Sequence, residues 1–223
     1  DTMFKAVLFD MDGLMFGTEA LAKKAWLVAG KDLGLPVTDE LVYKVIGMNQ
    51  EGVRRTCLEY LGEGFDFDGF RERVARYMEQ EMDESGVPVK RGLRELLNFL
   101  AQNHIPAAVA SSSSRTTVER YLDRAGLTSF FSALICGDMI THGKPAPDIF
   151  LTAAKALNTP PESCLVLEDS RNGILAAHAA GIPAVMVPDL IPPTDDLRRL
   201  VLCVCESLLD VIPILQNGAD NAR

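Results

Sequence analysis

The chain has 223 residues, of which 48% are hydrophobic and 24% are charged, a composition typical of soluble globular proteins. Lys and Arg number 22 against 31 Asp and Glu. The formal net charge of −9 argues against nucleic acid as a partner, because binding to its phosphates depends on clustered cations. No apolar run approaches the roughly 20 residues of a membrane span, and no secretory signal is recognisable. We therefore expect a cytoplasmic protein with no membrane partner.

Residues 4–9 form the first predicted element, a short apolar run that ends abruptly in Asp10-Met11-Asp12-Gly13. Similar apolar runs recur later in the chain, at 105–110, 134–136, 164–167 and 183–187. Each run is short and apolar on both faces, and a polar or glycine-containing turn follows it. This pattern is typical of buried parallel strands.

A stretch of purely helical periodicity interrupts this rhythm after the first strand. Apolar residues recur at helical spacing in four segments, 21–29, 41–46, 53–61 and 70–78. We expect four helices that form a cap domain, residues 17–84, inserted into a core domain of residues 1–16 and 85–223. The two connections, near 15–18 and 85–88, are candidate hinges.

Helical patterns and apolar runs alternate in the rest of the chain. The helical patterns end before Gly126, Asn158 and Gly181, and such a residue directly after a helix is a common C-terminal stop. Alternation of strands and helices predicts an α/β fold with a doubly wound parallel sheet.

Two carboxylates, Asp10 and Asp12, follow the first strand. They stand two positions apart, so on an extended backbone both side chains face the same way. An ionised carboxylate is already a nucleophile at neutral pH, and a second carboxyl beside it can protonate a leaving oxygen and later deprotonate water. The pair can equally begin a turn with Gly13, and taken alone it leaves both interpretations open.

Polar groups also follow the next strands. Ser111 and Ser112 precede a helix, where hydroxyls and backbone N–H groups either hold a phosphate oxygen or only cap the helix. Lys144 lies in a loop that Pro145 and Pro147 stiffen. Its ammonium is either a fixed phosphate-binding group or a solvated surface charge.

Glu168 and Asp169 directly follow the apolar run 164–167. Adjacent carboxylates at the end of a buried strand are costly unless a cation neutralises them. Oxygen ligands of this kind suit Mg²⁺, which we expect as the cofactor.

These four motifs, in this order, resemble those of the haloacid dehalogenase superfamily of phosphohydrolases. Residues 9–14 match the first motif of that family, Ser111 the second, residues 143–148 the third and residues 168–170 the fourth. The resemblance covers nearly the whole chain. The helical insert is similar to the small mobile cap of the β-phosphoglucomutase-like branch.

The resemblance implies a role for each matched residue. It makes Asp10 the nucleophile and a metal ligand. It makes Asp12 the general acid and base, whose backbone carbonyl also binds the metal. Ser111 and Lys144 are implied to grip the transferring phosphoryl group, and the acidic pair of the fourth motif to hold Mg²⁺. Closure of the cap is implied to place Asp12 beside the leaving group.

Two departures from the family pattern bear on the reaction. Gly17 stands where the first motif often continues with an aspartate before Thr18. β-Phosphoglucomutases carry a histidine and an arginine in the cap, at positions where approximate alignment places Ala22 and Gln50. That arginine grips the second phosphate of a bisphosphate, so its absence weakens a mutase interpretation. Our candidate substrate contacts in the cap are Thr18, Gln50 and Arg73.

We therefore expect a magnesium-dependent phosphatase acting on a small phosphorylated metabolite such as a sugar phosphate. Two alternatives remain open at this point, a phosphosugar mutase of the β-phosphoglucomutase type and a non-catalytic phosphate-binding protein on the same fold. The sequence predicts neither the physiological substrate nor the oligomeric state.

The five cysteines are odd in number and lack metal-ligand spacing. Cys136 and Cys164 fall in predicted strands, so we expect buried thiols there. Cys203 and Cys205 stand two positions apart and do not form a CxxC motif.

Overall fold

The computed structural model of the chain describes residues 4–46, 48 and 50–217. The chain divides into two compact units, a core unit of Asp1–Gly17 and Val89–Arg223 and a cap unit of Thr18–Pro88. The second junction lies after Pro88 and not after residue 84, because the last helix of the cap runs to Ser85 and residues 86–88 stay with it. Among the helices of the described residues, none combines the length and apolar character that a membrane crossing requires.

A six-stranded sheet forms the centre of the core unit, and neighbouring strands pair in parallel. Its order is β3-β2-β1-β4-β5-β6. The strands are β1 (Ala6–Phe9), β2 (Ala107–Ser111), β3 (Ala133–Cys136), β4 (Cys164–Glu168), β5 (Ala184–Met186) and β6 (Cys203–Val204). The first five correspond to the five apolar runs, which confirms the predicted doubly wound parallel sheet. Strand β6 was not predicted, because two residues give no readable period.

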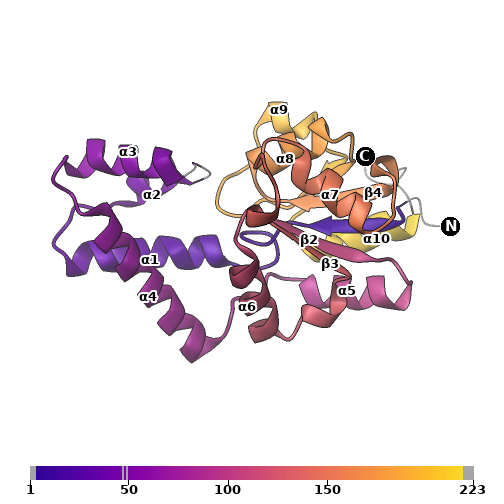
Figure 1. Cartoon of the computed structure of the whole chain (residues 1–223), viewed down its shortest axis with the longest axis horizontal. Helices are drawn as coiled ribbons and strands as arrows, with labels where there is room; N and C mark the ends of the chain where they lie inside the picture. The colour runs from indigo at the N-terminus through magenta and orange to yellow at the C-terminus, as the bar shows by residue number, and fades with distance from the viewer. Residues whose placement is uncertain (1–3, 47, 49, 218–223) are drawn as a thin grey trace. The chain divides into compact units, whose positions relative to one another are not determined.

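Helices cover both faces of this sheet. The core unit contains α5 (Leu93–Gln102), α6 (Arg115–Ala125), α7 (Asp148–Ala156), α8 (Arg171–Ala179), α9 (Asp195–Arg198) and α10 (Val211–Asn217), with the 3₁₀ turns η1 (Thr128–Phe130), η2 (Gly137–Met139), η3 (Pro161–Ser163) and η4 (Leu208–Asp210). Ala6 and Leu8 of β1 pack in one cluster with Phe150 of α7 and Ile174 of α8. Val7 and Phe9, which alternate with Ala6 and Leu8 along β1, point to the other face of the sheet. Figure 1 shows α7 and α8 on one side of the strands and α5 on the other.

The helix stops that the sequence predicted take up the expected backbone conformation. Gly126 caps α6 with a φ of 67°, and Gly181 follows α8 with a φ of 68°. Asn158, two residues after α7, has a φ of 53°. This left-handed region favours glycine and tolerates asparagine, so each residue turns the chain toward the next strand.

Four helices build the cap unit: α1 (Thr18–Asp32), α2 (Asp39–Val45), α3 (Gln50–Leu61) and α4 (Phe67–Ser85). Its small core joins Ala25 and Ala29 of α1 to Phe70 and Val74 of α4. Trp26 packs edge to face on Phe70, with 5.1 Å between ring centroids. Burial of this apolar face stabilises helices that would be marginal alone.

The two segments that lead to the cap lie side by side where they leave the core unit. Phe16 forms an antiparallel bridge with Val89, and the backbone N–H of Lys90 donates to the carbonyl of Met15 at 2.8 Å. Lys90 Nζ also donates to Asp189 Oδ1 at 2.6 Å. The two backbone contacts hold the two exits of the core together, and the ion pair joins the second exit to the segment after β5.

Candidate active site

The carboxyl ends of the central strands bring the predicted residues to one edge of the sheet. Asp10 follows β1, Ser111 ends β2 and Glu168 ends β4. Because β1 lies between β2 and β4 and all three run parallel, their ends are adjacent. The backbone N–H of Asp10 donates to the carbonyl of Leu167 at 3.1 Å, which continues the ladder into the site.

Lys144 connects the ends of three strands in this site. Its Nζ donates to Asp10 Oδ1 at 2.7 Å, to Glu168 Oε1 at 2.5 Å and to the carbonyl of Ala110 at 3.1 Å. The side chain is only 6% exposed. All three donor positions of the ammonium are therefore used, and the lysine is a fixed part of the site rather than a solvated surface charge.

Glu168 is fully buried, and its second carboxylate oxygen is held by its own loop. Oε2 accepts from the backbone N–H groups of Asp169 and Ser170 at 3.0 and 3.1 Å, and from Ser170 Oγ at 3.0 Å. Gly173 of α8 makes room for this carboxylate, because a Cβ there would lie 1.8 Å from Glu168 Cδ. Hydrogen bonds from residues 169 and 170 therefore fix the Glu168 carboxylate, and the absence of a side chain at Gly173 leaves space for it.

The electrostatics of the site show a shortage of positive charge. Burial first and the carboxylate of Glu168 second raise the pKa of Asp10 to about 7, against the opposing effect of Lys144. Burial acts to lower the pKa of Lys144, but the carboxylates of Asp10 and Glu168 outweigh it, so this pKa is raised and the lysine stays charged. One lysine does not neutralise all the carboxylates here.

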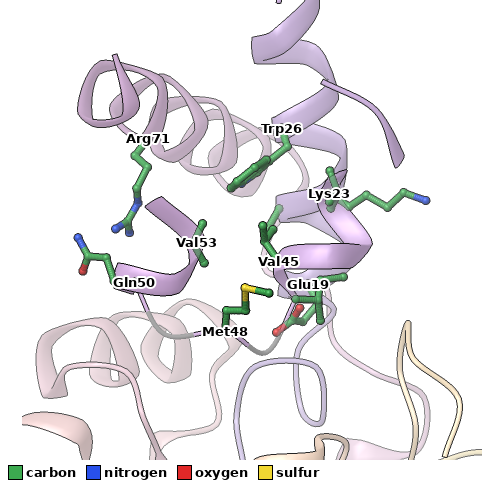
Figure 2. A pocket seen from close by; sticks show the side chains of 11 residues that line it. Glu19, Lys23, Trp26, Val45, Met48, Gln50, Val53 and Arg71 are labelled. Carbon is green, nitrogen blue, oxygen red and sulfur yellow. The ribbon is translucent and has the colours of Figure 1, made fainter. Parts of the chain in front are cut away.

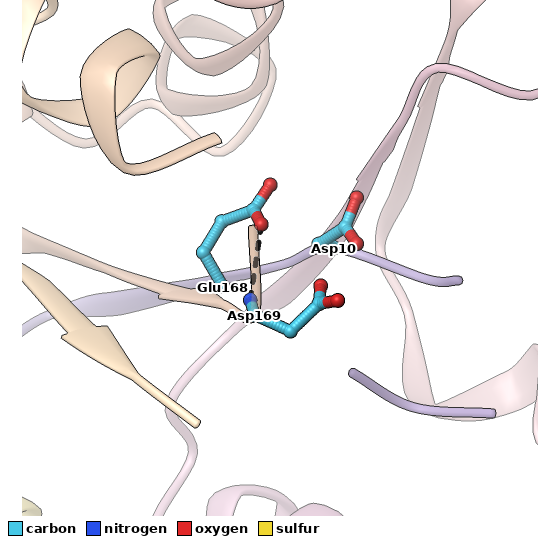
Figure 3. Close-up of side chains that lie close together, drawn as sticks. All are labelled: Asp10, Glu168 and Asp169. Atoms are coloured by element: carbon cyan, nitrogen blue, oxygen red, sulfur yellow. Dashed lines mark hydrogen bonds between the residues drawn. The ribbon is translucent and has the colours of Figure 1, made fainter. Parts of the chain in front are cut away.

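A cation would correct that shortage, and the site offers ligands for one. Asp10, Glu168 and Asp169 each present a carboxylate oxygen, and these oxygens lie within 4.8 Å of one another. Figure 3 shows the three side chains converging beyond the strand ends. A set made only of carboxylate oxygens fits a hard divalent cation such as Mg²⁺.

Asp12 has a partner that sequence reasoning missed. Ser113 Oγ donates to Asp12 Oδ2 at 2.8 Å, across 101 positions of sequence. The run of serines from 111 to 114 signalled a polar loop, but nothing in it distinguished Ser113 from its neighbours. The conformation of the loop distinguishes Ser113 from its neighbours. Ser111 Oγ accepts from the backbone N–H of Ser113 at 3.1 Å, and this hydrogen bond fixes the loop.

The predicted phosphate-binding serines differ in accessibility. Ser111 is 1% exposed at the end of β2, whereas Ser112 is exposed. Gly137 lies against this loop, since a Cβ there would meet the carbonyl oxygen of Ser112 at 2.1 Å. Ser114 caps α6 by accepting from the backbone N–H of Thr117. The four serines of the run therefore differ: Ser111 is buried, Ser112 is exposed, Ser113 faces Asp12 and Ser114 caps α6.

The cap unit contains a cavity of about 400 Å³. Gln50 and Arg71 point toward one another at one end of it, and Trp26, Val45 and Val53 form an apolar wall (Figure 2). The Arg71 guanidinium lies 5.9 Å from the ring centroid of Phe67. It makes no ion pair with another described residue.

Of the three cap candidates from the sequence, only Gln50 lines this cavity. Arg73 is not among the lining residues and pairs with Asp32 at 3.8 Å on the surface. Thr18 is buried at the start of α1. The cation beside Gln50 is Arg71, two positions before the predicted Arg73 on α4. Helical periodicity alone did not indicate which face of α4 meets the cavity.

Known proteins match this chain over most of its length. The family model for haloacid dehalogenase-like hydrolases matches residues 7–187, which include all four motifs. A phosphorylated carbohydrates phosphatase of Thermotoga maritima is 32% identical over 181 residues, covering 81% of this chain and 83% of that protein. Fructose-1-phosphate phosphatase YqaB of Escherichia coli is 29% identical over 186 residues, covering 82% and 96%. The solved structure of a β-phosphoglucomutase-type protein from Thermotoga maritima is 28% identical, with a TM-score of 0.82 and coverage of 96% and 100%.

Proposed function

The chain belongs to the haloacid dehalogenase-like hydrolase family and is a phosphohydrolase, and on this premise we propose a magnesium-dependent phosphatase that works through an aspartyl-phosphate on Asp10. The observation that carries the proposal is the convergence of Asp10, Lys144 and Glu168, from three separate segments, in one buried ion-pair cluster. If Asp10 only began a surface turn, we would not expect it to form a buried ion pair with Lys144.

The nucleophile in this proposal is Asp10. A carboxylate oxygen attacks phosphorus and forms the acyl phosphate, and the bond from phosphorus to the substrate oxygen breaks. Lys144 favours the ionised form of Asp10 and lowers the repulsion between that carboxylate and the phosphate dianion. Lys144 is already held at 2.7 Å from Asp10, so this electrostatic help needs no rearrangement.

Asp12 completes the reaction as acid and then base. Its carboxyl gives a proton to the departing substrate oxygen and later takes one from water, whose oxygen attacks phosphorus and releases Asp10 and inorganic phosphate. The hydroxyl of Ser113 holds Asp12 Oδ2 and restricts its orientation. We propose Ser113 as a positioning residue for this step.

Asp10 and Asp169, with Glu168 beside them, are the proposed holders of Mg²⁺. When bound, the ion would neutralise charge on the phosphate and on these carboxylates. Both carboxylate oxygens of Glu168 already accept hydrogen bonds, Oε1 from Lys144 Nζ and Oε2 from its own loop. Its main contribution is therefore to fix the lysine and the turn that carries Asp169.

We propose a small phosphorylated metabolite, of the sugar phosphate kind, as the substrate. The phosphatases named above act on phosphorylated carbohydrates and on fructose 1-phosphate. In the cap cavity, an apolar wall and the polar pair of Gln50 and Arg71 offer both contact area and hydrogen bonds to the organic part of such a substrate. We propose that this cavity selects the substrate.

A test of the function is release of inorganic phosphate from a panel of phosphorylated metabolites. We expect hydrolysis that needs Mg²⁺, stops when a chelator is added and returns when the ion is restored. Absence of phosphate release from every member, and from p-nitrophenyl phosphate, would favour the non-catalytic alternative.

The same assay separates the phosphatase from a phosphosugar mutase. A mutase must hold a bisphosphate intermediate while the sugar reorients, and charged contacts make such grips strong. Arg71 supplies one cation beside Gln50, and this cation is the structural observation that favours the mutase alternative. We expect β-glucose 1-phosphate with a bisphosphate primer to give inorganic phosphate or nothing. Efficient formation of glucose 6-phosphate would overturn the assignment.

A further inference from the structure

Two cysteines at the edge of the sheet form a cluster that the proposed reaction does not use. Cys203 begins β6, the last strand of the sheet, and Cys205 follows it. The backbone N–H of Cys205 donates to the carbonyl of Met186 at 2.8 Å, so the extended conformation continues through this residue. Residues two apart on an extended strand point to the same side. Their sulfur atoms lie 3.8 Å apart.

The other cysteines differ from this pair. Cys57, Cys136 and Cys164 are buried, and burial raises the pKa of each thiol to about 11. Within the described part of the chain, none of the three has a second cysteine sulfur in contact. Their thiols are therefore poorly reactive and have nothing to pair with.

The two thiols of the pair have unequal surroundings. Cys203 is partly exposed, whereas Cys205 is 8% exposed. The hydrogen bond between them lowers the pKa of Cys203 and raises that of Cys205, while Asp210 acts to raise both. Cys203 is thus the more accessible residue of the two, and its thiol is the one whose pKa is lowered.

We propose that Cys203 and Cys205 are a redox-active dithiol that hydrogen peroxide converts reversibly into an intrachain disulfide. The Cys203 thiolate attacks one peroxide oxygen, the O–O bond breaks, and a sulfenic acid and water result. The Cys205 sulfur then attacks the Cys203 sulfur and displaces a second water. Two thiols are oxidised and one peroxide is reduced to two waters.

The fold makes closure feasible and reversal easy. The sulfur atoms must approach from 3.8 Å to a bond length of about 2.05 Å. The strand lies at the sheet edge, so it can bend without breaking a ladder on its outer side. The loop that closes contains one residue between the cysteines, and a short loop gains little from cross-linking. A thiol reductant should therefore reopen it.

The experiment is peptide mapping of the reduced, full-length chain after brief treatment with hydrogen peroxide. The reaction is quenched with catalase and N-ethylmaleimide under denaturing conditions. Both cysteines lie on the tryptic peptide that follows Arg199. We expect this peptide to lose the mass of two hydrogen atoms, to carry no maleimide and to recover both thiols after dithiothreitol. The peptides with Cys57, Cys136 and Cys164 should still take maleimide.

Variants test the two roles. Cys205→Ser should let Cys203 proceed to sulfinic acid, because the resolving thiol is gone, and Cys203→Ser should leave Cys205 unoxidised at the same peroxide dose. Cys57→Ser is the control and should keep the cross-link. The proposal is wrong if the wild-type peptide takes two maleimides after treatment or accumulates sulfinic acid, or if either cysteine cross-links to a different one. The readout is mass alone, so it does not depend on phosphatase activity.

Discussion

Asp10 and Asp12 are two residues apart, yet their different surroundings suit the different roles that we propose for them. Asp10 is bonded to Lys144, whereas Asp12 is held by a neutral serine. A carboxylate fixed to a cation suits attack on phosphorus, and one held by a hydroxyl can exchange a proton. The division of labour follows from the partners and not from the aspartates themselves.

Replacing Asp12 by Asn should lower turnover roughly 10²–10⁴-fold, the usual range for a lost general acid and base. The loss should be smaller for p-nitrophenyl phosphate, whose leaving group needs little protonation. Steady-state kinetics on this substrate and on an alkyl phosphate check the comparison. Equal losses on both would remove Asp12 from the acid role.

Lys144→Ala should abolish turnover and lower the free energy of unfolding by about 3–5 kcal/mol, because it leaves buried carboxylates without their cation. Urea unfolding and the phosphatase assay measure the two effects. Lys155→Ala, on an exposed position of α7, is the matched control and should change neither. Near-normal activity of the Lys144 variant would make the third motif a coincidence.

At the residue scale, the sequence predicted the groups whose chemistry is unusual for their place. Carboxylates after a buried strand and a lysine just before two prolines are unusual for their places, and in the structure they contact one another. Ser113 and Arg71 were not predicted, because one serine in a run and one arginine on a polar helix look like their neighbours. Only the turn and the helix face distinguish them.

At the scale of elements, Gly173 allows α8 to pack against the site. Because glycine has no side chain, the Glu168 carboxylate can lie against the first turn of the helix. The N–H of Gly173 donates to Ser170 Oγ at 3.1 Å, and that hydroxyl holds Glu168 in turn. The helix start therefore orients the carboxylate that fixes Lys144.

Gly173→Ala should destabilise the fold by about 1–3 kcal/mol, the range for overpacking, although alanine is the better helix former. Displacement of Glu168 should also lower turnover. Gly64→Ala is the control, because a Cβ there meets nothing within 4 Å. Thermal unfolding of the two variants gives the comparison, and equal stability of both would show that Glu168 moves freely.

The sequence predicted elements well where their period or stop residue was strong. Strands β1, β2, β4 and β5 are buried on both faces, and Gly126 and Gly181 end helices with a positive φ that glycine tolerates. It did not predict β6, whose two residues are paired only by tertiary contact with β5. A short edge strand forms only by pairing with its neighbouring strand, so the local sequence pattern does not predict it.

At the scale of the whole molecule, our proposal places the phosphoryl-transfer chemistry in one unit and substrate selection in the other. The core unit holds the carboxylates and Lys144, and the cap unit holds the cavity with Gln50 and Arg71. The family motifs lie in the core, so they predict the reaction. They leave the substrate unpredicted, since the cap follows no comparable code.

Arg71→Ala should raise KM for the best substrate of the panel by roughly tenfold or more, as expected for a lost charged hydrogen bond. Arg73→Ala is the matched control on the same helix, since that side chain pairs with Asp32 outside the cavity. Kinetics of both variants on the same substrate check the difference. An equal effect of the two would remove the cavity from substrate selection.

The most direct test of the central claim is chemical trapping of the phosphorylated enzyme during turnover. Borohydride reduces an aspartyl-phosphate to homoserine, which peptide mapping can locate. We predict homoserine at position 10 in the wild-type chain with substrate and Mg²⁺, none without substrate, and none in Asp10→Asn, which should also be inactive. Homoserine at another position, or substantial turnover by Asp10→Asn, would contradict the proposed mechanism.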